Sequence, residues 1–153
     1  MNLLFDTNII IYISRDKSEK KVLDFVNPAN QNVHVSYACI AEVESIAYQN
    51  EWGKQKNRRF EEFLDEVQIL QIDDTLLKTY VEIDSFSQKR HRDFDEYNFK
   101  TPRNMGKNDL YIASSASLLN LTLVTTDGDF DHLHNHFLNL RKIYPEELQN
   151  LIR

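Results

Sequence analysis

The stretch Leu3-Leu4-Phe5-Asp6-Thr7-Asn8 decides the fold class, because three consecutive apolar residues run directly into three polar ones. A short apolar run that is closed by polar residues is typical of a buried strand. Residues 121–126 form a second predicted strand, and Asp127 follows them. We therefore expect two buried strands, each with an acidic residue just beyond its carboxyl end.

Further strand patterns alternate with helical patterns along the chain. This alternation indicates a parallel sheet with helices on both faces, and 153 residues is a typical length for one domain. We predict an α/β fold: a single three-layer α/β/α domain over residues 1–153, with a central, mainly parallel sheet of four to five strands. The predicted strands are 3–5, 33–35, 67–72 and 121–126, with a short fifth at 138–143. In the first half of the chain we predict a helix that starts within 9–13, a helix over 18–26, a helix capped by Ser36 and a helix over 54–66. In the second half we predict a helix from Asp73 or Asp74 to about Gln88, a helix from Asn108 or Asp109 to about Leu119, and a turn or helix from Pro145.

The charge balance is acidic, with 18 basic and 24 acidic residues and a net charge of −6. This argues against a general nucleic-acid-coating protein, which would be basic overall, but not against an enzyme that gathers its acids in one place. Cys39 is the chain's one cysteine and cannot form an internal disulfide. No apolar run approaches the ~20 residues of a membrane span, and Asp6 comes too early for a signal peptide. We expect a cytoplasmic protein with no membrane contact.

Several acids map to one edge of the predicted sheet. Asp6 and Asp127 follow strands, and parallel sheets bind ligands at the carboxyl ends of their strands. Helical spacing places Asp109 on the inward face of its helix, where the alternative role is that of an N-terminal cap. Glu42 and Glu44 lie on either side of an apolar helix stripe, and periodicity does not choose between them. Each acid also has an ordinary explanation as a turn residue or a solvated charge, so the argument rests on their convergence.

Three or four carboxylates in one cleft repel each other and raise each other's pKa values. Hard divalent cations with oxygen ligands relieve this repulsion. Two such metals, roughly 3.5–4 Å apart, can activate a water and stabilise the leaving oxygen of a phosphodiester. The sequence therefore predicts an acidic metal-binding cleft suited to nuclease chemistry.

Four segments along the chain resemble the PIN-domain nucleases, in particular the VapC-type toxins of bacterial toxin–antitoxin modules. Leu4-Phe5-Asp6-Thr7-Asn8 is similar to the family's opening strand and first acid, and residues 36–42 to its Ser-to-Glu segment. Residues 108–113 resemble its third-acid helix, and residues 123–130 its Thr-x-Asp strand end with the following Phe. The resemblance runs from end to end and implies the PIN fold.

The resemblance also implies the site residues and the activity. It selects Glu42 over Glu44, and it leaves open whether Asp129 replaces or supports Asp127. It implies a Mg²⁺-dependent endoribonuclease, with Mn²⁺ as the alternative ion, that acts on RNA as a toxin, forms a homodimer and is blocked by a cognate antitoxin protein. The implied catalytic acids are Asp6, Glu42, Asp109 and Asp127, the metal ligands are these four and Asp129, and the supporting residues are Thr7, Asn8, Asn108 and Thr125.

Residues 89–106 form the longest predicted loop, and it is polar and basic. A loop of this length in a compact domain is usually functional or mobile. Because it leads directly into the Asp109 helix, we expect its cations to contact RNA phosphates. Tyr97 and Phe99 would either stack on unpaired bases or anchor the loop to the core. The weakly assigned RNA-binding residues are Lys100, Arg103 and Lys107, whereas the basic residues within 54–59 are expected to be solvated helix charges.

Other chemically suggestive residues receive ordinary roles. His132, His134 and His136 match no zinc motif, and we expect them at the surface or at a helix start. Cys39 lies on an apolar helix face and is expected in the core. Trp52 is expected to be a packing residue or a dimer anchor.

Three other functions remain to be weighed against the nuclease. A non-catalytic PIN module that binds RNA or a protein partner is the main alternative. A phosphorylation-receiver domain is ranked low, because Asp6 has no paired acid and Asp127 and Asp129 stand where that reading needs a lysine. A haloacid-type phosphatase would need a second Asp where Asn8 stands.

Overall fold

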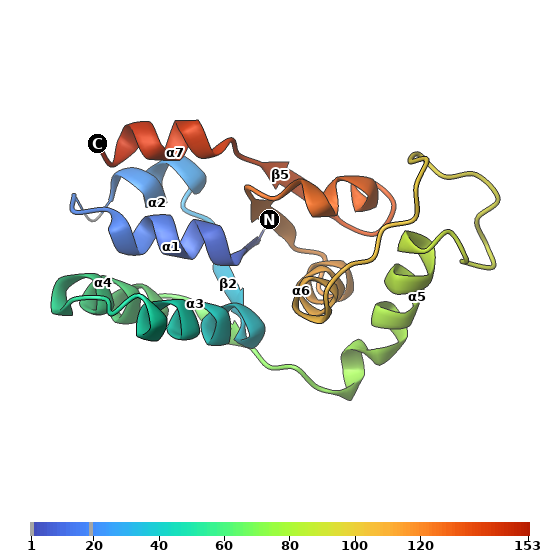
Figure 1. Cartoon of the computed structure of the whole chain (residues 1–153), viewed down its shortest axis with the longest axis horizontal. Helices are drawn as coiled ribbons and strands as arrows, with labels where there is room; N and C mark the ends of the chain where they lie inside the picture. The colour runs from blue at the N-terminus through green and yellow to red at the C-terminus, as the bar shows by residue number, and fades with distance from the viewer. Residues whose placement is uncertain (1, 19) are drawn as a thin grey trace.

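A parallel sheet lies at the centre of the structure (Figure 1). The computed structural model describes residues 2–18 and 20–153, and within these residues five strands form one sheet in the order β3-β2-β1-β4-β5. Every neighbouring pair is parallel, so the predicted fold class is confirmed. The strands are β1 (Leu3–Phe5), β2 (Val33–Ser36), β3 (Gln68–Leu70), β4 (Thr122–Thr125) and β5 (Asn139–Lys142).

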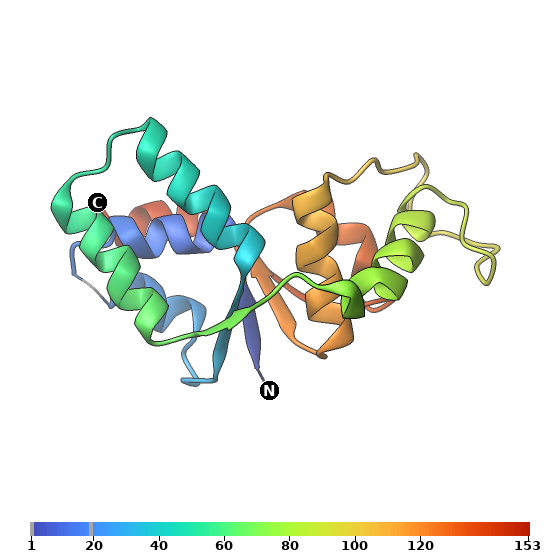
Figure 2. The same cartoon turned by 90° about the horizontal axis from the view of Figure 1, so that it is seen from below.

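Helices cover both faces of this sheet (Figure 2). Helices α1–α4 lie on one face, and α5, α6 and the 3-10 helix η2 lie on the other. Right-handed crossovers explain this division, because the chain moves from β1 to β2 and β3 in one direction, and returns to β4 and β5 in the other. None of the helices in the described residues is long and apolar enough to cross a membrane. The helices are α1 (Thr7–Arg15), α2 (Lys21–Val26), α3 (Tyr37–Gln49), α4 (Lys54–Asp65), α5 (Leu77–Ser87), α6 (Lys107–Leu118) and α7 (Pro145–Leu151), with η1 (Asp74–Leu76) and η2 (Gly128–Leu133).

Three helix starts differ from the prediction. α1 begins at Thr7, before the predicted range 9–13, because the side chain of Asp6 caps it. α6 begins at Lys107, one residue before the earlier of its two predicted starts, because Gly106 occupies the N-cap position and the Asn108 side chain bonds elsewhere. α2 begins later than predicted, at Lys21. Residue 19 of the predicted helix 18–26, like residue 1 of the predicted domain, lies outside the described residues.

The buried strands explain the apolar runs seen in the sequence. Phe5 points to the α1–α4 face and stacks on Phe63 of α4, with ring centroids 6.1 Å apart. Leu4 pairs in register with Leu123 of β4, and both are fully buried. Because helices cover both faces, successive residues of a strand are apolar instead of alternating with polar ones.

Cys39 takes its predicted position in the core, and Trp52 packs against that core. Cys39 is fully buried on α3, and burial raises the pKa of its thiol. Trp52 packs edge-on against Phe60, with ring centroids 6.4 Å apart. Trp52 therefore packs against the core while partly exposed, and its role as a dimer anchor stays a prediction.

The strand order reverses at β1, and the carboxyl edge of the sheet is therefore a switch point. The connection after β1 leads toward β2, whereas β4 lies on the other side of β1 and leads to β5. Such a switch point leaves a crevice in which α/β proteins bind ligands. Asp6 directly follows β1, and Asp127 follows β4 after one further residue. The sheet therefore brings acids from opposite ends of the sequence to one place.

Candidate metal centre

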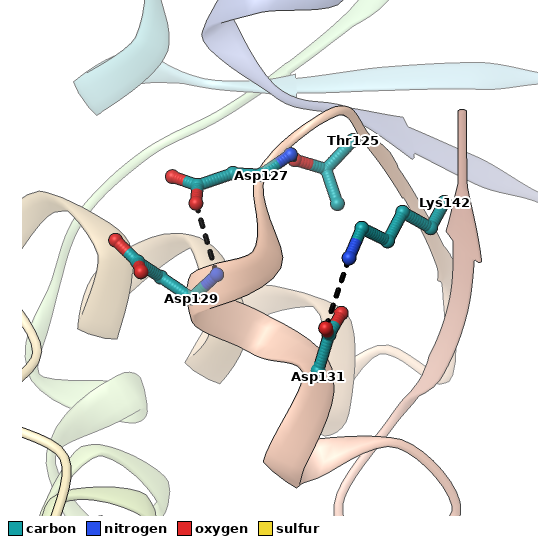
Figure 3. A network of polar contacts seen from close by, with 5 residues as sticks. All are labelled: Thr125, Asp127, Asp129, Asp131 and Lys142. Atoms are coloured by element: carbon teal, nitrogen blue, oxygen red, sulfur yellow. Dashed lines mark hydrogen bonds and ion pairs between the residues drawn. The ribbon is translucent and has the colours of Figure 1, made fainter. Parts of the chain in front are cut away.

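Three carboxylates converge at this edge of the sheet. Asp109, Asp127 and Asp129 each offer one oxygen, and these oxygens all lie within 4.8 Å of one another. Asp109 lies in the first turn of α6, and Asp127 is the N-cap of η2. The Asp127 Oδ1 atom accepts a hydrogen bond of 2.9 Å from the backbone N–H of Asp129. As Figure 3 shows, this turn directs both of its carboxylates to the same side.

Asp6 lies deeper than these three carboxylates and is not a member of their group. Its side chain is only 5% exposed and caps α1 by accepting a hydrogen bond of 2.8 Å from the Thr7 backbone N–H at Oδ1. Burial is the main cause that raises its pKa, and the negative charges of Asp127 and Glu42 raise it further. Asp6 is thus electrostatically coupled to the acidic group although it is more buried.

Thr125 links Asp6 to the start of η2, which carries Asp127 and Asp129 and is called the acidic turn below. Its hydroxyl donates a hydrogen bond of 2.6 Å to Asp6 Oδ2 and accepts one of 3.0 Å from the backbone N–H of Asp127. Thr125 is fully buried at the end of β4. A single side chain therefore orients one acid and fixes the backbone of another.

Glu42 reaches the site from α3 through a neighbour of Asp109. Asn108 Nδ2 donates a hydrogen bond of 2.8 Å to Glu42 Oε1, and Glu44 is exposed. An open pocket of about 380 Å³ is lined by Glu42, Asn108 and Asp109, together with Gly106 and Lys107. Glu42, and not Glu44, thus lies beside the third acid.

The two remaining polar residues of the opening motif lie close by but act differently. Asn8 Nδ2 donates a hydrogen bond of 3.2 Å to Thr126 Oγ1, and it joins the start of α1 to the segment after β4. The Thr7 hydroxyl is buried and has no hydrogen-bond partner among the described residues. Thr7 supports Asp6 through its backbone N–H.

The electrostatics of the group favour a cation beside the carboxylates. The pKa of Asp109 is raised to about 7, first by burial and then by the charges of Asp6, Asp127, Glu42 and Asp129. An all-carboxylate donor set suits a hard divalent cation such as Mg²⁺ or Mn²⁺. The residues present therefore fit a metal ion, although nothing in the donor set identifies it.

The cation beside the acidic turn is already engaged. Lys142 Nζ forms an ion pair of 2.9 Å with Asp131 Oδ2. In Figure 3 this pair lies on the far side of the turn from the carboxylates of Asp127 and Asp129. The field of Asp127 contributes to raising the pKa of Lys142, but the hydrogen bond to Asp131 is the largest cause.

The expected position at the surface or at a helix start is wrong for His132, which lies in the last turn of η2. Its side chain is 2% exposed, and its Nε2 atom lies 2.7 Å from the hydroxyl oxygen of Ser87. The ring stacks on Phe86, with centroids 6.3 Å apart. Both partners lie far away in the sequence, so the polar His-x-His-x-His spacing carried no sign of this burial. His134 and His136 are exposed, as expected.

The loop aromatics anchor the loop, which was one of the two roles considered for them. Tyr97 and Phe99 both pack against the buried Phe86, with centroids 5.2 and 5.6 Å away. The predicted RNA-binding residues Lys100, Arg103 and Lys107 are all exposed, and Lys107 lines the pocket beside Asp109.

Comparison with known proteins places the chain in a family. The model of the PIN domain matches residues 3–135, whereas comparison with curated proteins gave no significant match. Among solved structures, VapBC2 from Rickettsia felis bound to a DNA fragment from their promoter has a TM-score of 0.71 and 22% identity, over 93% of this chain and 98% of that one. VapBC-1 from nontypeable Haemophilus influenzae has a TM-score of 0.68 and 25% identity, over 93% and 98%. VapC20 from Mycobacterium tuberculosis, a toxin that cleaves the sarcin–ricin loop, has a TM-score of 0.59 and 14% identity, over 91% and 98%. Because the family match covers most of its length, this chain belongs to the PIN domain family.

Proposed function

We propose that this chain is a metal-dependent endoribonuclease that hydrolyses RNA phosphodiester bonds and serves as the toxin of a type II toxin–antitoxin module. The convergence of Asp109, Asp127 and Asp129 beside the buried Asp6 carries this proposal. Membership in the PIN domain family supports the nuclease activity. The structural similarity to VapC20, a sarcin–ricin loop cleaving toxin, agrees with a toxin role.

The position of each residue gives it a separate role in the proposed site. Thr125 and the Thr7 backbone hold the two oxygens of Asp6, so this carboxylate has a fixed direction. The proposed catalytic acids are Asp6, Glu42, Asp109 and Asp127, the proposed metal ligands are these four and Asp129, the supporting residues are Thr7, Asn8, Asn108 and Thr125, and the proposed RNA contacts are Lys100, Arg103 and Lys107.

The proposed reaction is hydrolysis by in-line attack of water on the scissile phosphate. When bound, a Mg²⁺ or Mn²⁺ ion would supply a Lewis acid that polarises the phosphate and lowers the pKa of a bound water. Asp109, Asp127 and Asp129 would hold such an ion near the start of α6. Attack that breaks the bond to the 3′-oxygen leaves a 5′-phosphate and a 3′-hydroxyl.

The proposed partners follow from the same family. We propose a cognate antitoxin that covers the acidic pocket, a homodimer, and a cytoplasmic place of action where RNA is the substrate. A non-catalytic PIN module that binds RNA or a protein is the second candidate. The convergence of Asp109, Asp127 and Asp129 favours the nuclease, because crowded carboxylates repel each other unless a cation lies among them.

Cleavage of total bacterial RNA by antitoxin-free protein tests the proposal. We expect discrete fragments with Mg²⁺ or Mn²⁺ and none with EDTA. The variants Asp6→Asn and Asp109→Asn should lose cleavage by at least ~100-fold, because each removes a charge that holds the metal and phosphate. Asp131→Asn is the matched control, since it changes an acid of the same turn that points away from the group.

Two results would count against the nuclease. Cleavage that persists in EDTA, or that is unchanged in both Asp6→Asn and Asp109→Asn, would exclude the proposed metal centre. Tight RNA or protein binding without cleavage under any condition would favour the non-catalytic module.

A further inference from the structure

The connection between α5 and α6, residues 89–106, carries a charge opposite to that of the rest of the chain. This segment, the basic arm, holds five basic and three acidic residues, so its net charge is +2 while the remaining residues together carry −8. Within the described residues, no carboxylate forms an ion pair with an arm cation. Arg90, Arg92, Lys100 and Arg103 are exposed. The arm therefore keeps a net positive charge, and no described carboxylate pairs with its cations.

The basic arm is a packed structure. Its aromatic residues gather around Phe86, whose ring centroid lies 4.8 Å from that of Phe94. Lys89 Nζ donates a hydrogen bond of 2.8 Å to the Lys100 carbonyl oxygen and closes the arm on itself. The same ammonium lies 5.8 Å from the centroid of the Tyr97 ring. Because the rings face inward, the arm presents its cations outward, and this suits contact with a phosphate backbone better than base stacking.

Ser87 fixes the basic arm to the acidic turn. Its carbonyl oxygen accepts a hydrogen bond of 2.7 Å from the backbone N–H of Arg103, near the end of the arm. Its hydroxyl lies 2.7 Å from Nε2 of His132, and His132 belongs to η2, whose first turn holds Asp129. Ser87 is fully buried. The root of the arm, its end and the turn that carries the acids therefore meet at one residue, whose backbone bonds the arm and whose hydroxyl bonds His132.

The arm leads directly to the acidic pocket. Its last residue, Gly106, lines the pocket together with Lys107, Glu42 and Asp109. In Figure 1 the arm, drawn in yellow, extends outward beyond α5 and then returns to the start of α6. A polyanion that leaves the pocket in this direction meets Lys107 first and the cations of the arm next.

We propose that the basic arm binds the phosphates of the RNA strand on one side of the cut, and that the contact between Ser87 and His132 keeps the arm in register with the acidic turn. This inference rests on the proposed nuclease function. It makes Lys100 and Arg103 substrate-positioning residues, and Ser87 a positioning residue that acts through His132.

Binding of RNA without cleavage tests the arm. The probe is a fluorescein-labelled single-stranded RNA of 12 nucleotides, followed by fluorescence anisotropy in EDTA over a range of salt concentrations. Lys100→Glu with Arg103→Glu should weaken binding at least ~10-fold and lower the slope of log K against log salt by about 1.4, the value for two lost phosphate contacts on a single strand. The matched control is Lys17→Glu with Lys54→Glu, which makes the same charge change at exposed positions outside the arm and should alter binding less than twofold.

The position of Ser87 is tested by kinetics. Ser87→Ala removes the contacts of the hydroxyl with His132 and with Met105 Sδ. It should raise KM for RNA on the order of tenfold and leave kcat and the affinity for Mn²⁺ unchanged. Ser14→Ala is the matched control, because Ser14 is equally buried and its hydroxyl donates a hydrogen bond of 2.9 Å to a backbone carbonyl within α1. Its KM should match that of the wild type.

The outcomes separate this inference from the nuclease itself. If wild-type protein cleaves RNA and the arm variant binds and cleaves equally well, the arm proposal fails and the nuclease stands. If wild-type protein does not cleave with Mg²⁺ or Mn²⁺, the nuclease fails whatever the anisotropy shows. The arm proposal would also fail if the wild type did not bind RNA. It would fail as well if polyglutamate at equal charge concentration displaced the RNA, and this result would indicate an acidic protein partner.

Discussion

The two ends of η2 differ in almost every physical respect, although only a few residues separate them. At its start, Asp127 and Asp129 direct two carboxylates toward Asp109, within 4.8 Å of one another. At its end, His132 is buried against Phe86 and bonded to Ser87. The first end gathers like charges that repel each other, and the second is packed and bonded. The contacts at the end of η2 thus hold in place a turn whose start costs stability.

The end of η2 that holds His132 against Phe86, here called the aromatic end, should show the largest effect of mutation on stability. The opposite end, with Asp127 and Asp129, is called the acidic end. Phe86 is fully buried and contacts six other aromatic or histidine rings of the arm, η2 and the segment after it. Phe86→Ala should lower the free energy of unfolding by about 3–5 kcal/mol, because it leaves a large cavity. Urea denaturation in EDTA measures this, with Phe25→Ala, at a 36% exposed position, as the control. Equal losses of unfolding free energy in the two variants would show that the aromatic end does not anchor the turn.

Acid should weaken the aromatic end through His132. Burial is the main cause that lowers its pKa to about 4, and the charge of Arg103 adds to this. The unfolded chain takes up a proton near pH 6.5, whereas the folded chain does so only near pH 4, so stability is lost as pH falls between these values. Between pH 7 and pH 5 this group should cost roughly 2 kcal/mol, and His132→Gln should lose that dependence. Parallel pH profiles for the two proteins, measured by urea denaturation, would contradict the burial of a neutral imidazole.

The acidic end should respond to pH in the opposite sense. The folded-state pKa of Asp109 is raised to about 7, chiefly by burial, so its contribution to stability is lost as pH rises toward and through 7. In EDTA, Asp109→Asn should be more stable than the wild type at pH 7.5 by about 1 kcal/mol after allowance for solvent screening. The difference should shrink at pH 5. A variant that is less stable than the wild type at pH 7.5 would show that Asp109 is held by a favourable partner.

The sequence predicted the acidic end far better than the aromatic end. Asp6 and Asp127 were predictable because an acid after a buried strand reaches a known edge of a parallel sheet. The periodicity left Glu42 and Glu44 open, and only the family resemblance chose Glu42, which then proved to lie beside Asp109 in the pocket. Such local rules carry over to three dimensions because the sheet topology is strongly constrained.

The position of His132 could not be predicted in this way. Its burial depends on Ser87 and Phe86, which belong to another helix, and no local pattern encodes a contact between separate elements. The same holds for the choice between Asp127 and Asp129, because the hydrogen bond between them turns both carboxylates to one side. The role of Tyr97 could not be predicted either, because the sequence does not show whether its ring points inward or outward.

The hydrogen bond between Thr125 and Asp6 joins residues that lie 119 positions apart, and this has a consequence for the order of synthesis. Chains emerge from the ribosome N-terminus first, so β1 and Asp6 are exposed long before their partners exist. A nascent chain that ends at residue 120 has neither the strand that orients Asp6 nor the turn that carries Asp127 and Asp129. The acidic group therefore forms late during translation, and prematurely terminated chains of this kind lack it.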